Sequence, residues 1–268
     1  MKRRRRRGAS VDPITAAYDA ILATEPTVPL LFRLTEYRGQ QVLFQDAACT
    51  VPVASIGDPV GGVRHPVTGA ILATQATDAA RPIWGGEDVG LTLEGTEFLT
   101  VQSNVDFITE TGVFSMLSSH QLSSEAAGRI CGIFSGDLST AAGSAGLVFE
   151  DRSDVGSMES RNFWTRAGGA PREIRTSDVY VLGQKATASL TGDGFAGLLR
   201  SYLGGVEIGT RVFTDGSGSS FTSTLSVGAA GDPSPASYYL GSIATALAYD
   251  KTLSPSEVSN ISALLEAV

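Results

Sequence analysis

The sequence has few of the residues that bind metals or form covalent cross-links. It contains two cysteines, Cys49 and Cys131, and two histidines, His65 and His120. Two thiols are too few for a disulfide framework, so we expect both to be reduced, with a single bridge as the alternative. Neither histidine has a second histidine, a cysteine or an acidic residue at ligand spacing, which argues against a metal cluster. Each histidine is predicted to lie at the surface or in a turn.

Long apolar runs are also missing. No run approaches the length that crosses a membrane, and residues 8–29 contain Asp12, Asp19, Glu25 and prolines where a signal peptide would have an apolar core. We therefore expect no export signal and no membrane partner.

Positive charge is scarce outside the first residues. The chain has a net charge of −8, although its first ten residues include a run of cations: Lys2, Arg3, Arg4, Arg5, Arg6 and Arg7. The rest of the chain is therefore strongly acidic and would repel nucleic-acid phosphates. The basic arm, residues 1–12, is predicted to be flexible. Three roles stay open for it: a solvated leader, a contact with an acidic protein surface, or a contact with nucleic acid.

Glycine and proline are abundant, with 31 and 11 residues. Such a composition favours many short strands joined by turns. Strand-like segments without intervening helices predict an antiparallel two-sheet β-sandwich. The predicted strands are 91–93, 97–101, 113–117, 129–134, 146–150, 161–166, 178–190, 198–203, 206–213, 223–227 and 239–249.

Two turns are predicted within this region. Gly204 and Gly205 separate two strand-like runs and supply the positive φ that a two-residue hairpin turn needs. Residues 94–96 (Glu-Gly-Thr) are predicted to form a tight turn between antiparallel strands.

The C-terminal stretch 238–268 carries the clearest pattern. An apolar strand, 239–249, is followed by a turn and by a helix that begins with Ser254 as N-cap, Pro255 at the first position and Glu257 closing a capping box. The order Y-x-x-G-x-I-A-x-x-x-x-Y-D-K-x-L-S-P-x-E-V resembles the closing strand and helix of concanavalin A-like (laminin-G-like) jelly rolls. That resemblance implies an all-β jelly-roll sandwich with a short C-terminal helix.

A second segment, 43–82, is similar to one that precedes such jelly rolls in bacteriophage structural proteins. It contains F-Q-D, T-x-P-V, G-D-P-V-G and A-T-Q-A-T-x-A-A-R-P. Together the two resemblances cover about residues 43–268 and imply a virion protein, assembled in the host cytoplasm. Other virion proteins and further copies of the chain would be its partners.

We expect three parts in the chain. Residues 1–12 form the basic arm, residues 13–81 form an extended anchoring region with one short helix at 13–24, and residues 82–268 form the jelly roll. Strand candidates at 30–34 and 41–44 lie within the anchoring region. Its prolines, glycines and alanines favour an extended chain laid along another surface.

Catalytic motifs are weak. Residues 192–197 match G-x-G-x-x-G, but the next segment is too short for the helix that a dinucleotide site requires. The run 150–154 has the wrong spacing for the paired carboxylates of a glycoside hydrolase. His120 follows two serines without an assignable acid for a triad. The chain is therefore predicted not to be an enzyme.

Binding residues can still be nominated. Sugar sites combine aromatic stacking with polar groups and sometimes a calcium ion. The candidates for glycan contact are Trp164, Tyr202 and Tyr238, and those for calcium are Asp193, Asp215 and Asp232. The alternative for each is a packing or turn-forming role.

The sequence thus predicts a non-catalytic virion protein that decorates a capsid or forms a fibre, spike or tail appendage. A glycan-binding adhesin for host attachment is the alternative, and a glycoside hydrolase is the third hypothesis.

Overall fold

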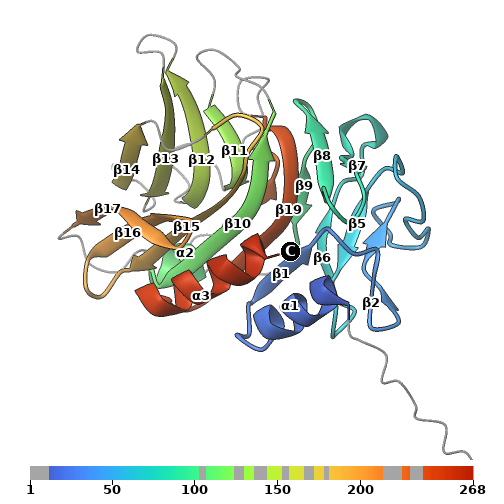
Figure 1. The fold of residues 1–268 in the computed structure, drawn as a ribbon, viewed down its shortest axis with the longest axis horizontal. Helices are drawn as coiled ribbons and strands as arrows, with labels where there is room; N and C mark the ends of the chain where they lie inside the picture. Colours follow the sequence, from blue (N-terminus) through green and yellow to red (C-terminus); the bar gives the residue numbers. More distant parts are fainter. Residues whose placement is uncertain are drawn as a thin grey trace, which may run out of the picture.

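The fold is a sandwich of two antiparallel β-sheets, with two helices on the outer side of one of them (Figure 1). It comes from a computed structural model, which describes residues 12–102, 107–123, 130–135, 144–152, 157–165, 172–177, 181–213, 225–229 and 238–267. The predicted all-β fold class, with a helix near the C-terminus, is confirmed.

The front sheet has eight strands in the order β17-β16-β15-β10-β19-β8-β7, with β1 also paired to β19. The strands of the front sheet are β1 (Val28–Leu31), β7 (Ile83–Trp84), β8 (Leu91–Glu94), β10 (Phe114–Leu122), β15 (Lys185–Asp193), β16 (Leu198–Leu203), β17 (Val206–Val212) and β19 (Leu240–Tyr249).

The back sheet has nine strands in the order β14-β13-β12-β11-β18-β9-β6-β5-β4. The strands of the back sheet are β4 (Leu43–Phe44), β5 (Gly62–Arg64), β6 (Ile71–Thr74), β9 (Leu99–Val101), β11 (Ile130–Ser135), β12 (Ser144–Arg152), β13 (Ser157–Thr165), β14 (Arg172–Ser177) and β18 (Ser226–Val227). A separate pair joins β2 (Glu36–Tyr37) to β3 (Gln40–Gln41).

Strand β19 lies in the middle of the front sheet. One of its sides pairs with β10 along most of its length, while the other side pairs with β8 in its first half and with β1 in its second half. Most of its side chains are buried, including Ile243, Leu247 and Tyr249. The apolar run at 239–249 is therefore explained by burial on both faces of the sheet.

The predicted helix start is confirmed. Helix α3 (Pro255–Glu266) has Ser254 as its N-cap, and the Ser254 hydroxyl accepts from the Glu257 N–H while the Glu257 carboxylate accepts from the Ser254 N–H at 2.7 Å. Val258, Ile261 and Leu265 are buried against the front sheet. Because the cap fixes the helix start and the apolar stripe fixes its rotation, α3 lies flat on the sheet.

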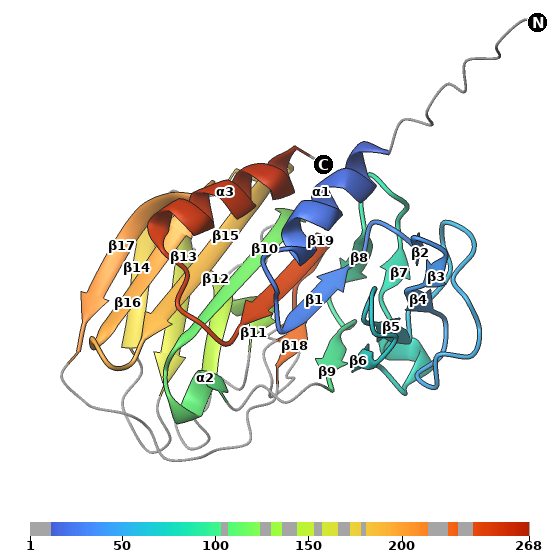
Figure 2. The ribbon, with the colours of Figure 1, turned by 90° about the horizontal axis from the view of Figure 1, so that it is seen from below.

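Helix α1 (Pro13–Leu22) lies beside α3 on the same side of the front sheet (Figure 2). The Tyr18 hydroxyl lies 3.3 Å from Thr245 Oγ1, and Thr24 Oγ1 lies 2.9 Å from the Tyr249 hydroxyl. Both contacts reach β19 or its end. Burial raises the pKa of Tyr18 to about 12. The predicted short helix is therefore confirmed, and it docks on the sandwich.

The region 13–81 differs from the extended anchor that we expected. Its strand β1 pairs with β19 in the front sheet, and β4, β5 and β6 extend the back sheet through β9. Leu30, Leu43 and Val63 are fully buried. Short apolar segments between prolines and glycines are sufficient for short strands at the end of a sheet, so this segment completes both sheets and does not lie outside them.

The two predicted turns have different outcomes. The hairpin at Gly204 and Gly205 is confirmed, since both have positive φ (55° and 75°) between the paired strands β16 and β17. The hairpin around Gly95 is wrong, although Gly95 has a φ of 104°. Its flanking strands, β8 and β9, belong to different sheets. The turn therefore carries the chain from the front sheet to the back sheet.

His120 is another correction. It was expected at the surface or in a turn, but it lies in β10 with 2% of its area exposed and makes an edge contact with Tyr239, with ring centroids 6.2 Å apart. Its register partner is Ile243, and both side chains are buried. Burial lowers the pKa of His120 to about 3. His65 is a turn residue, since its Nδ1 accepts from the Val67 N–H at 3.0 Å.

Candidate functional site

Two of the aromatic residues nominated from the sequence are buried. Trp164 is 3% exposed, donates from its indole nitrogen to the Ile108 carbonyl at 2.9 Å and packs on Phe213 with ring centroids 5.0 Å apart. Tyr202 is 1% exposed. Neither ring offers a face for stacking on a sugar, so the structure gives both residues packing roles.

The other nominated residues are not brought together. Tyr238 is partly exposed, with its ring 6.1 Å from that of Phe98. Asp193 accepts from the N–H groups of Phe195 and Ala196, as a turn-forming aspartate does. The remaining candidates, which are Asp215, Asp232 and the arm residues Lys2 to Arg7, lie outside the described residues.

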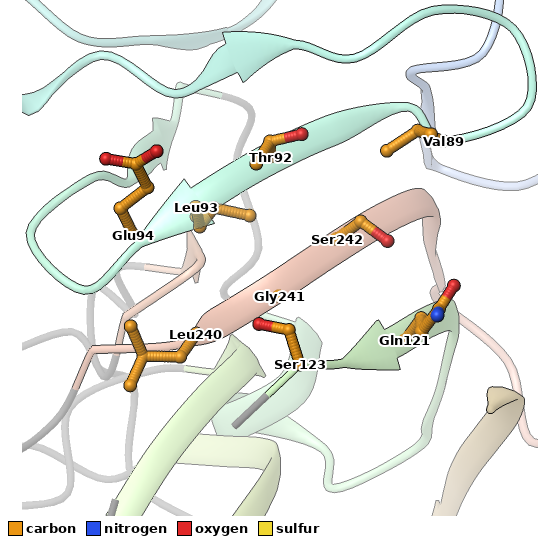
Figure 3. Close-up of a pocket in the computed structure, with 9 residues that line it drawn as sticks. All are labelled: Val89, Thr92, Leu93, Glu94, Gln121, Ser123, Leu240, Gly241 and Ser242. Carbon is orange, nitrogen blue, oxygen red and sulfur yellow. The ribbon is translucent and has the colours of Figure 1, made fainter. Parts of the chain in front are cut away.

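A groove on the outer face of the front sheet is the best-formed candidate site. It has a volume of about 500 Å³. Figure 3 shows that its side chains come from β8 and the loop before it, from β19, and from the end of β10 and the residue that follows it. The residues that line it are Val89, Thr92, Leu93, Glu94, Gln121, Ser123, Leu240, Gly241 and Ser242. The groove thus combines hydroxyl, amide and carboxylate groups with apolar surface.

Strand register explains why the polar groups converge. Thr92 on β8 is paired with Ser242 on β19, and Ser242 is paired with Gln121 on β10. Directly paired residues of antiparallel strands point to the same face. The alternate residues, such as Leu91 and Ile243, are fully buried. The polar side chains of Thr92, Gln121 and Ser242 therefore share the outer face, while alternate residues of the same strands face the core.

Gly241 forms the floor of the groove. It has a φ of 150°, and a Cβ at this position would lie 2.2 Å from the carbonyl oxygen of Gln121. A side chain here would collide with the β10 backbone and force β19 away from β10.

The acidic rim of the groove is held by the turn after β8. The Glu97 carboxylate accepts from the Glu94 N–H at 2.7 Å and from the Thr96 hydroxyl at 2.9 Å. Partial burial raises the pKa of Glu97, but hydrogen bonds from Thr96 and Glu94 outweigh it, so the pKa is lowered overall. Glu97 thereby fixes the turn that presents the side chain of Glu94.

Within the described part of the chain, no three His, Cys, Asp or Glu side chains gather in a way that could hold a metal ion. None of its helices is long and apolar enough to cross a membrane.

Sequence reasoning missed the groove. Its polar residues are isolated threonines, serines and glutamines in mostly apolar strands, and none forms a motif. The usable signal was the two-residue spacing of 121 and 123, at the end of β10 and just after it, and of 240 and 242 on β19. That signal identifies a site only when the register between the strands is known.

Searches by sequence found no matching family model and no similar curated protein. Solved structures with a similar fold were found. They include a SAP-like pentraxin from Limulus polyphemus (16% identity, TM-score 0.50, covering 64% of this chain and 80% of that one). Domain 4 of AbnA, an extracellular arabinanase from Geobacillus stearothermophilus in complex with arabinotriose, gives 13% identity, a TM-score of 0.53 and coverage of 88% and 98%.

The binding domain of botulinum neurotoxin serotype G gives 10% identity, a TM-score of 0.52 and coverage of 90% of this chain and 51% of that one. At these identities the similarity concerns the fold. This chain has the antiparallel, jelly-roll-like β-sandwich fold that lectin-like binding domains share.

Proposed function

We propose that this protein is a non-catalytic carbohydrate-binding module and that the groove on the outer face of the front sheet is its glycan site. The groove of about 500 Å³, with polar groups converging from β8, β10 and β19, is the observation that carries this proposal.

The chemistry of the groove suits a sugar. Thr92, Ser123 and Ser242 can each donate and accept through a hydroxyl, and Gln121 offers both an amide donor and a carbonyl acceptor. Sugar hydroxyls have the same dual character. Leu240 adds an apolar surface for the C–H face of a ring. A groove with these groups supports moderate affinity, because each hydrogen bond to a sugar replaces one to water.

Catalysis is not part of the proposal. A retaining glycoside hydrolase needs two carboxyl groups about 5–5.5 Å apart. Glu94 is the single carboxylate among the described residues that line the groove, and Glu97 is occupied in hydrogen bonds within its turn. We therefore propose recognition without bond cleavage.

The biological setting is proposed from the sequence resemblance. Residues 43–82 resemble a segment of bacteriophage structural proteins, and the C-terminal strand and helix resemble those of the concanavalin A-like jelly rolls that such segments precede. A glycan-binding sandwich displayed on a virion would attach the particle to a host surface, and the basic arm would contact an acidic partner. Locating the protein in purified particles, with and without residues 2–7, tests this setting separately from glycan binding.

A glycan array probed with the purified protein tests the proposed function, with and without calcium. We expect binding to a restricted set of glycans, and we expect it to be lost in a Gln121→Ala, Ser242→Ala double variant. Asn260→Ala is the matched control, because Asn260 is exposed on α3 away from the groove. Absence of binding to every glycan, or unchanged binding by the double variant, would overturn the proposal. Release of free sugar would show that the protein is an enzyme.

A further inference from the structure

The polar side chains of the groove belong to a longer row that crosses four strands. Thr92 is paired with Ser242, Ser242 with Gln121, and Gln121 with Lys185 on β15. All four positions face the outer side of the front sheet, because direct partners in antiparallel strands share a face. Neighbouring strands lie about 4.8 Å apart, so the row from Thr92 to Lys185 spans about 14 Å. That length exceeds a single sugar ring.

A second cavity lies at the far end of this row. It has a volume of about 180 Å³ and is lined by Val181, Gln184, Lys185, Ala186, Thr187, Leu203, Gly204 and Glu266. Lys185 therefore belongs to both the row and the second cavity. Glu266 comes from the last turn of α3, so the end of the helix forms one wall.

Gln121 joins the two cavities. Its side chain lines the first cavity, and its amide donates to the carbonyl of Gly183 at 2.6 Å, within the turn that precedes β15. This hydrogen bond holds the Gln121 side chain between the two cavities. A ligand that lay along the row would meet Thr92 and Ser242 first, then Gln121, and finally Lys185.

The charges at the far end differ from those of the first cavity. Lys185 and Glu266 line the same cavity. Partial desolvation of the Lys185 ammonium and the charge of Arg33 lower the pKa of Lys185, and the charge of Glu266 opposes that shift. A lysine and a glutamate side by side offer a strong donor and a strong acceptor. Such a pair can bind the vicinal hydroxyls of a sugar unit.

We infer that the two cavities form one extended site for a linear oligosaccharide, with Lys185 and Glu266 binding the unit farthest from Thr92. This inference rests on the proposed function and adds the class of ligand: a chain that runs across the strands, longer than a disaccharide. Lys185 and Glu266 are then the residues that determine the preferred chain length.

Isothermal titration with defined sugars tests the inference. The probes are glucose, mannose, galactose and arabinose, their linear disaccharides and hexasaccharides, and the matching galacturonate series. For the sugar that binds, the wild-type affinity is expected to rise from disaccharide to hexasaccharide. Lys185→Gln and Glu266→Gln are expected to weaken hexasaccharide binding about tenfold, the effect of one charge-assisted hydrogen bond, and to leave disaccharide binding within about twofold.

Ser242→Ala is the matched comparison, since Ser242 lies in the first cavity and its loss should weaken disaccharide and hexasaccharide alike. Equal affinity for disaccharide and hexasaccharide would overturn the extended site while leaving the glycan-binding function in place. Lys185→Gln would likewise overturn the extended site if it weakened the affinity for disaccharide and hexasaccharide equally. Binding of none of these sugars at either length would overturn the extended site, and a silent glycan array would remove the proposed function as well.

Discussion

The outer face of the front sheet has two ends with similar side chains and different surroundings. Beneath α1 and α3, the hydroxyls of Ser119, Thr187 and Ser189 are buried. At the open end, one row further along the same strands, Gln121 and Lys185 are exposed. Polar side chains therefore occur at both ends of this face. Whether they serve packing or binding depends on where the helices end.

The largest expected effect is at the covered end. Leu265 is fully buried on α3, against the sheet. Leu265→Ala should lower the free energy of unfolding by about 2–5 kcal/mol, because it leaves a cavity and removes apolar burial. Urea unfolding measures the change, with Asn260→Ala on the exposed side of α3 as control. Glycan affinity of the folded variant should stay unchanged; a large loss would mean that the two ends are coupled.

Low pH is expected to reduce folding stability through the buried His120 and not through the exposed residues of the groove. His120 has a folded-state pKa of about 3, against about 6.5 in an unfolded chain. Above pH 7 this difference has no effect. As the pH falls below 6.5, His120 becomes protonated in the unfolded state but stays neutral in the native state. The free energy of unfolding therefore falls by up to about 1.4 kcal/mol per pH unit.

At pH 5 the loss attributable to His120 is therefore about 2 kcal/mol. Urea unfolding at pH 7 and pH 5 measures it in the wild type, in His120→Gln and in the control His65→Gln. The difference between the two pH values should shrink most in His120→Gln and less in His65→Gln, because burial lowers the pKa of His65 as well. An unchanged difference in His120→Gln would show that His120 takes up its proton in the native state as well.

A smaller effect is expected at the start of α3. Ser254→Ala removes the hydroxyl that accepts from the Glu257 N–H and should cost about 1 kcal/mol. Asn260→Ala, on the exposed side of α3, is the control and should be close to neutral in thermal or urea unfolding. Equal effects of the two changes would argue against the cap as the source of stability.

The smallest changes in the free energy of unfolding are expected for two substitutions in β10, one at the covered end and one at the open end of the outer face. Ser119→Ala removes a buried hydroxyl that has no hydrogen-bond partner among the described residues, so stability should stay the same or rise by up to about 1 kcal/mol. Gln121→Ala, two residues along β10, should change stability by about 0.5 kcal/mol or less and weaken glycan binding several-fold. Titration and urea unfolding of both variants separate the two roles. Weaker binding in Ser119→Ala would contradict the division.

The sequence predicted the fold more fully than the site. The capping box at Ser254, the apolar strand at 239–249 and the Gly204-Gly205 hairpin are local patterns, and all three are present in the structure. Pairing across the chain was harder to predict. The turn at Gly95 has the right residue for a hairpin, but only the packing of two sheets shows that its flanking strands separate.

The candidate site was not predictable for the same reason. Thr92, Gln121, Lys185 and Ser242 are spread over about half of the chain and meet only through the register of four strands. Aromatic residues drew attention because they often stack on sugars, yet Trp164 lies in the interior. Residue type can suggest a binding role, but the exposure of the side chain in the fold shows whether it can contact a ligand.

The central position of β19 also matters for how the molecule reaches its native state. Because the strand is inserted between β10 on one side and β8 with β1 on the other, the front sheet stays in two pieces until residues near the C-terminus arrive. Chains that stop before Leu240 would leave the long, apolar edge of β10 unpaired, and such an edge invites aggregation. Removal of C-terminal residues that include β19 is therefore expected to damage folding more than the location of α3 on the outside of the sheet suggests.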